Sequence, residues 1–107
     1  MSVLDINKID FIGTDRQTGE VILTISDHIN WDDTQYHLSA LQEKINAYLN
    51  FIDSEEIYKE YPNAIGKKLI VQITGKYHIN KEGHEFIEKV AAFLNNGDIG
   101  FEVKYGA

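Results

Sequence analysis

Residues 69–74 read Leu-Ile-Val-Gln-Ile-Thr, and residues 21–26 read Val-Ile-Leu-Thr-Ile-Ser. Both stretches are rich in β-branched residues and alternate in the way expected of a strand with one buried face. The first lies inside a longer expected strand, Lys68 to Tyr77. The second follows an apolar segment, Ile9 to Gly13, and a turn in which Gly19 can adopt a positive φ. We therefore expect these last two segments to form a β-hairpin.

An amphipathic helix is expected after the hairpin. Its apolar side chains recur at a spacing of 3.6 residues up to about Phe51, and Asn30 is the expected N-cap. Asp32 and Asp33 would then lie in the first turn, where the helix dipole favours negative charge. A short further helical piece is expected within residues 53–61.

The second half of the chain continues the alternation of helix and strand. Asn80 precedes a second helical segment, residues 81–95, and residues 99–105 alternate as a last strand. The order ββαβαβ predicts a single α/β (α+β) domain over residues 1–107, a two-layer sandwich with a four-stranded mixed sheet and two helices on one face. Strands joined through helices should pair in parallel. The other sheet face would be semi-polar, with Ile12, Ile22, Thr24, Ile70 and Thr74.

Composition narrows the class of protein. Of the 107 residues, 43% are hydrophobic and 25% are charged, as in ordinary globular domains. The chain has no cysteine, which excludes disulfides, thiolate metal sites and cysteine catalysis and favours a reducing compartment. Residues 1–5 lack the basic start of a signal peptide, and no apolar stretch reaches the length of a membrane span. We therefore expect a cytoplasmic protein without a membrane partner.

The formal net charge is −7, and the acidic residues gather in residues 27–60. Such a surface repels a phosphate backbone, so nucleic-acid binding is disfavoured. It attracts a basic protein instead, although acidic residues also serve solubility.

Aromatic residues accompany this acidity. Trp31 is the only tryptophan, and it is either a packing staple beside the helix start or an interface anchor. A non-enzymatic protein-binding module is therefore the leading hypothesis. Its predicted partner-binding residues are Trp31, Asp32, Asp33, Tyr36, Glu55, Glu56, Tyr58 and Tyr61.

The sequence gives less support to an enzyme or to a structural homodimer, and no cofactor is expected. A metal-dependent enzyme could use Asp27, His28, Asp33 and His37, but two-histidine metal motifs pair histidines at a fixed spacing that does not occur here. Asp27 and Asp32 could form an acid/base pair, a pattern of low specificity in so acidic a region. A homodimer, formed through the semi-polar sheet face or the edge near Tyr105, is a third alternative.

Several segments together resemble a family of short bacterial proteins that form a domain of unknown function. The segments are Ile9–Gly13, Leu23–His28, Trp31-Asp32, Leu41–Leu49, Ile57-Tyr58 and Tyr61-Pro62. The resemblance implies a bacterial cytoplasmic protein. Small acidic proteins of this type often serve as immunity partners of toxins, many of which are basic nucleases. By this analogy, the expected partner is a toxin domain.

Overall fold

The computed structural model describes residues 3–95 and 97–106. Its elements, in chain order, are β1 (Phe11–Thr14), β2 (Val21–Asp27), α1 (Thr34–Asp53), α2 (Glu56–Glu60), a 3₁₀ turn (Pro62–Ala64), β3 (Leu69–Gly75), α3 (Lys81–Leu94) and β4 (Ile99–Tyr105). The predicted order of strands and long helices is confirmed, and α2 is the short helical piece expected before the proline.

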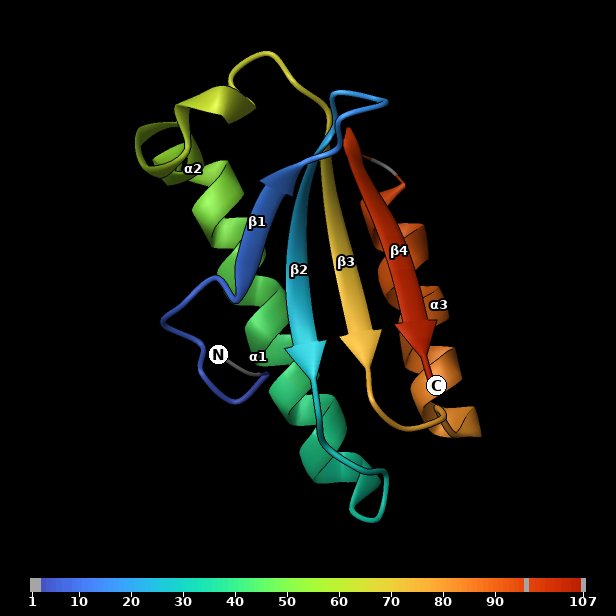
Figure 1. The fold of residues 1–107 in the computed structure, drawn as a ribbon. Helices are drawn as coiled ribbons and strands as arrows, with labels where there is room; N and C mark the ends of the chain where they lie inside the picture. The colour runs from blue at the N-terminus through green and yellow to red at the C-terminus, as the bar shows by residue number, and fades with distance from the viewer. Residues whose placement is uncertain (1–2, 96, 107) are drawn as a thin grey trace.

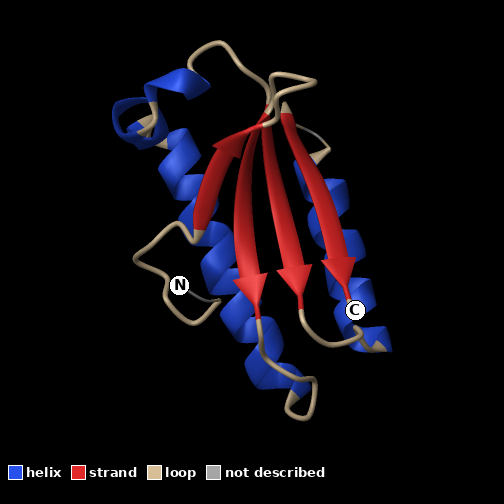
Figure 2. Cartoon of the chain, in the orientation of Figure 1, coloured by secondary structure: helices blue, strands red, loops and turns tan. Residues whose placement is uncertain are grey.

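The four strands form one sheet in the order β1-β2-β3-β4. β1 pairs with β2 in antiparallel orientation, and the two crossovers through helices make β2–β3 and β3–β4 parallel. Figure 1 shows β1 and β4 at the two edges of the sheet, with α1 and α3 behind it. Figure 2 shows the resulting two layers, which confirms the predicted sandwich with a mixed sheet.

The core lies between the sheet and α1. On β2 and β3, the positions that alternate toward the helices are buried, and on α1 the buried residues recur every three or four positions. This regular burial explains why the alternating stretches of the sequence predict the central strands. The hydrophobic members of this core include Leu23, Ile25, Leu41, Ile45, Tyr48, Val71 and Ile73.

The sheet face assigned to Ile12 was wrong. Ile12 lies opposite Leu23, which is fully buried, so both side chains point toward the helices. Its neighbour Phe11 lies on the open face instead and is 63% exposed. β1 also begins two residues later than the predicted strand, because the Asp10 side chain accepts from the backbone N–H of Ser26.

The predicted start of α1 was also wrong. The N-cap is Asp33, whose carboxylate accepts from the backbone N–H of Tyr36, and the helix begins at Thr34. Asp32 and Asp33 therefore precede the first turn of the helix. Asn30 instead accepts from the backbone N–H of Asp32 through its side chain and lies outside the helix.

The second long helix is capped as predicted but is less deeply buried. Asn80 caps α3 by accepting from the backbone N–H of Gly83. Phe93, predicted within its apolar stripe, is 68% exposed, whereas Leu94 is buried. Over residues 3–95 and 97–106, no helix has both the length and the apolar character that crossing a membrane requires.

Candidate functional site

A buried polar cluster forms where the three parallel strands end. Asp27, Gly75 and Tyr105 are the last residues of β2, β3 and β4, and the sheet register aligns them in one row. The Tyr105 hydroxyl donates to Oδ2 of Asp27 over 2.6 Å. A Cβ atom at Gly75 would lie 2.0 Å from the Tyr105 ring. The glycine therefore allows the tyrosine to cross β3 and reach a strand two positions away.

His37 completes this cluster from the first turns of α1. Its Nε2 lies 2.6 Å from Oδ2 of Asp27, and its Nδ1 lies 3.0 Å from the carbonyl oxygen of Asn30. The Asp27 carboxylate also accepts from Tyr105 and from the backbone N–H of Ile29. Both ring nitrogens therefore face acceptors, and a doubly protonated imidazole satisfies both. The two side chains form a buried ion pair when the imidazole carries both protons.

Trp31 covers this ion pair. Its ring stacks on the His37 imidazole with 3.7 Å between centroids, which suits a cation–π contact. A Cβ atom at Gly83 would lie 2.6 Å from the Trp31 ring, so the glycine lets α3 approach. The indole Nε1 is buried and has no hydrogen-bond partner among the described residues. Trp31 therefore packs as a staple onto the start of α1 and also joins α1 to α3.

The cluster is closed to solvent in this structure. Asp27 and His37 are 1% and 0% exposed, so neither side chain lies on the surface. The structure also separates the residues of the metal hypothesis, because Asp33 caps α1 and His28 is exposed. In the part of the chain that the structure describes, no three histidine or acidic side chains are placed to hold a metal ion.

A second buried ion pair holds the N-terminal segment. Lys44 Nζ lies 2.9 Å from Oδ1 of Asp10 and donates to the carbonyl oxygens of Asp5 and Lys8. Tyr48, one turn further along α1, accepts from the backbone N–H of Asp10 and donates to the carbonyl oxygen of Thr24. This site was not predicted from the sequence. Its one signal there is that Lys44 falls on the buried stripe of α1.

Tyr48, which is buried, and Tyr105, which is half-buried, predict a loss of stability at alkaline pH. Burial raises the pKa of Tyr105 above the usual value of about 10, and so do its hydrogen bond to Asp27 and the Asp27 charge. Burial also raises the pKa of Tyr48, where the hydrogen bond from the Asp10 backbone acts in the opposite direction. The unfolded chain ionises first, so this contribution is complete below about pH 10 and declines as the pH rises toward the folded-state values.

Above about pH 10, the free energy of unfolding should fall by about 1.4 kcal/mol per pH unit for each of these two tyrosines. Urea denaturation between pH 9 and about pH 11.5 measures it. Tyr105→Phe and Tyr48→Phe should each remove one tyrosine's share of the slope. Equal slopes in wild type and both variants would contradict the assignment.

The predicted partner-binding residues lie in two groups. Trp31, Asp32, Asp33 and Tyr36 lie at the start of α1, whereas Glu55, Glu56, Tyr58 and Tyr61 lie beyond its end. α1 has 20 residues, so about 30 Å separate the two groups. Within them, Tyr36, Asp32, Asp33, Glu55 and Glu56 are exposed, while Trp31, Tyr58 and Tyr61 are half-buried.

Two hollows along one side of α1 lie between these groups. The smaller, of about 260 Å³, is bordered by Leu4, Ile6, Tyr36 and Glu43. The larger, which we call the edge groove, has a volume of about 750 Å³ and also contains Ile6. The edge groove is lined by Ile6, Asn7, Lys8, Ile9, Ile12, Ala47, Phe51, Glu56, Glu60 and Tyr61.

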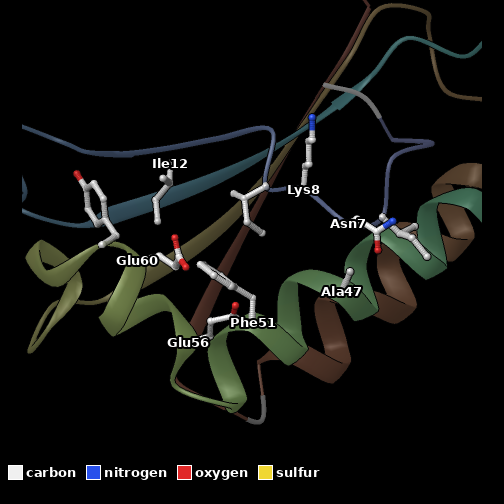
Figure 3. A pocket seen from close by; sticks show the side chains of 10 residues that line it. Asn7, Lys8, Ile12, Ala47, Phe51, Glu56 and Glu60 are labelled. Atoms are coloured by element: carbon white, nitrogen blue, oxygen red, sulfur yellow. The ribbon is translucent and has the colours of Figure 1, made fainter.

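Figure 3 shows Asn7 and Lys8 at one end of the edge groove and Glu56 and Glu60 at the other, with Phe51 between them. The helix residues that border the two hollows, which include Tyr36, Glu43, Ala47 and Phe51, follow one face of α1 at intervals of three or four. The two groups are therefore connected along this face.

Only part of this surface was predicted from the sequence. Tyr36, Glu56 and Tyr61 line the hollows, whereas Tyr58 packs against the core on another side. The missed residues include Leu4 and Ile6, which are 48% and 45% exposed. They precede the first strand, where no periodicity indicates which side chains face outward.

Comparison with known proteins gives one match. A model of a family of unknown function, DUF6572, matches residues 1–107. The chain belongs to this family. DUF6572 has no assigned activity, and neither a curated protein nor a solved structure matches the chain. The match confirms the prediction of a domain family of unknown function.

Proposed function

We propose that this member of DUF6572 is a non-enzymatic protein-binding module whose partner is a basic protein. The observation that carries the proposal is the pair of neighbouring hollows along α1, which share Ile6 and where exposed apolar side chains lie beside carboxylates. Leu4, Ile6 and Tyr36 supply the apolar surface, and Glu43 and Glu56 supply charge. Interfaces commonly combine buried aromatic anchors with charged rims.

The charge of the chain supports the same kind of partner. The formal net charge is −7, and none of the three ion pairs among the described residues involves Asp32, Asp33, Glu43 or Glu56. These carboxylates create a negative potential that steers a positively charged protein toward α1. A toxin domain in the cytoplasm of a bacterium is the most concrete partner, which would make the protein an immunity protein that covers the toxin surface.

The partner is identified by capture on the tagged protein from a lysate of the source organism, at low and moderate salt. Association rates are then measured for Asp32→Lys combined with Asp33→Asn. Asparagine is used at position 33 because it retains the side-chain oxygen that caps α1. We expect association to slow about tenfold at low salt, with a smaller effect as salt screens the charges.

The matched control has the same change in net charge at residues that line neither of the two hollows. Glu85→Lys combined with Glu102→Gln alters exposed residues of α3 and β4. If both double variants slow association equally, the effect comes from total charge rather than from the α1 surface. If neither does, the electrostatic part of the proposal is wrong.

A further inference from the structure

We propose that the outer edge of β1 and the edge groove bind an extended segment of the partner as an added strand, with a lysine or arginine of that segment beside Glu56 and Glu60. This inference rests on the proposed function, because it names how a protein partner would be bound. Such strand addition takes its affinity from main-chain hydrogen bonds and its specificity from pockets for alternate side chains.

The first observation is the unpaired edge of β1. The backbone N–H of Val21 donates to the carbonyl oxygen of Lys68, toward β3 and away from β1. Val21 lies opposite Thr14, and Leu23 lies opposite Ile12. In an antiparallel ladder, hydrogen-bonded and non-hydrogen-bonded pairs alternate, so the N–H and C=O groups of Ile12 and Thr14 point outward. They present the pattern that another strand requires.

The second observation is the sequence of this edge. Proteins block exposed edges with charged side chains, proline or bulges, and they also keep edge strands very short. β1 is short, at four residues, but it reads Phe-Ile-Gly-Thr, has no charge or proline, and keeps a regular register with β2. β4, at the other edge of the sheet, contains Glu102 and Lys104. The two edges therefore differ, and β1 is the one whose side chains carry no charge against an added strand.

The third observation is the apolar groove beside that edge. Ile12 points from β1 into the edge groove, which Ala47 and Phe51 line from α1 (Figure 3). On the opposite face of β1, Phe11 is largely exposed. An added strand would therefore meet apolar surface with both sets of its alternating side chains.

The fourth observation is the charge at one end of the groove. Glu56 and Glu60 lie one helical turn apart on α2, and like charges at this spacing repel each other. Neither carboxylate forms an ion pair with any residue that the structure describes. Lys8 lies at the other end of the groove, where its side chain points away from α1 (Figure 3). A basic side chain is the complementary occupant, because its aliphatic stem can cover Phe51 while its charge reaches the carboxylates.

The test uses nuclear magnetic resonance with a blocked eight-residue peptide of alternating valine and lysine. In the free protein, the amide hydrogens of Ile12 and Thr14 should exchange with solvent faster than those of Phe11 and Gly13. The peptide should slow exchange at Ile12 and Thr14 and shift resonances of the edge groove. Absence of shifts at millimolar peptide, or shifts confined to another surface, would overturn the inference.

Matched variants separate the two parts of the site. Thr14→Pro removes one outward N–H group and should weaken binding about tenfold, whereas Thr14→Ala keeps that group and should have a much smaller effect. Glu56→Gln combined with Glu60→Gln should weaken binding, whereas Glu85→Gln combined with Glu102→Gln should not. Equal affinities of the two Thr14 variants would contradict the added strand. Equal affinities of the two glutamate double variants would contradict the role of Glu56 and Glu60.

A second experiment leaves the protein unchanged. In a strand, the backbone groups of alternate residues point to opposite edges, so N-methylation of all valines or of all lysines blocks one edge of the peptide. One methylated peptide should lose binding and the other should retain it. Equal binding of both would exclude an added strand. A free protein of twice the monomer mass that Thr14→Pro converts to monomer would identify a second copy as the occupant and overturn the proposed partner.

The outcome is separable from that of the proposed function. If a basic partner binds the wild-type protein and the Thr14 and Glu56/Glu60 variants equally well, the proposed function stands and the edge site is wrong. If the peptide binds at the edge but the protein retains no basic partner, the edge site stands and the proposed function is wrong.

Discussion

Replacing Asp27 with asparagine should destabilise the protein by about 3–5 kcal/mol, the usual cost of removing one partner of a buried ion pair. The carboxylate accepts hydrogen bonds from His37, Tyr105 and the backbone of Ile29. An amide has the same shape, but it carries no charge, and one of the two accepting oxygens becomes an NH2 group that cannot accept from these buried donors. Because the free energy of unfolding of a whole domain is only about 5–15 kcal/mol, the variant should be close to unfolding.

Urea denaturation followed by circular dichroism measures this effect, and the thermal midpoint should fall by about 4 °C for each kcal/mol. Tyr105→Phe should cost only about 1 kcal/mol, because the carboxylate keeps its other donors. Asp32→Asn, at an exposed position, is the control and should change stability by less than about 0.5 kcal/mol. A loss of less than about 1 kcal/mol for Asp27→Asn would show that the pair is not ionised.

Lys44→Met should lower the free energy of unfolding by about 3–5 kcal/mol, as much as Asp27→Asn does. Methionine fills the space of the aliphatic stem, but it leaves the Asp10 carboxylate and the carbonyl oxygens of Asp5 and Lys8 without their shared donor. The N-terminal segment, which contributes Ile6, Lys8 and Ile9 to the edge groove, should then detach more readily from α1.

A double-mutant cycle isolates the ion pair. Lys44→Met combined with Asp10→Asn should be more stable than the sum of the single losses predicts, by at least about 1 kcal/mol. Lys8→Met removes an exposed ammonium group and should be nearly neutral. Strict additivity in the cycle would mean that Lys44 and Asp10 contribute independently.

The fold could be predicted from the sequence to the extent that burial is periodic. Strands β2 and β3 alternate because helices cover one of their faces, and that alternation is visible in residues 21–26 and 69–74. β1 was harder because Phe11 and Ile12 are adjacent and both apolar. Only the pairing of Ile12 with Leu23 decides which of them faces the core, since a shift of one residue exchanges the two faces.

The buried clusters could not be predicted from the sequence, because they bring together residues that are far apart in the chain. Asp27 and His37 were identified as chemically interesting, but Tyr105, their third member, is 78 positions from Asp27. Gly75 has no side chain to signal that an aromatic ring crosses it. The candidate surface was recovered in part, because exposed Tyr36 and Glu56 lie in the acidic region, whereas the N-terminal residues beside them follow no pattern.

The parallel pairing of the central strands also has a consequence for the time course of folding. Thr24 and Gln72 are neighbours on β2 and β3 but lie 48 positions apart in the chain. The β1–β2 hairpin is local and can form within about 1–10 microseconds, whereas long-range pairing must first overcome the entropy of closing a large loop. We expect the hairpin to form early, while the edge of β2 that later pairs with β3 is still unpaired. β3 can pair with it only after α1 has formed and closed the loop between them. At high protein concentration, the unpaired edge of β2 in this hairpin should favour self-association. The overall folding rate should be set by the closure of the loop between β2 and β3.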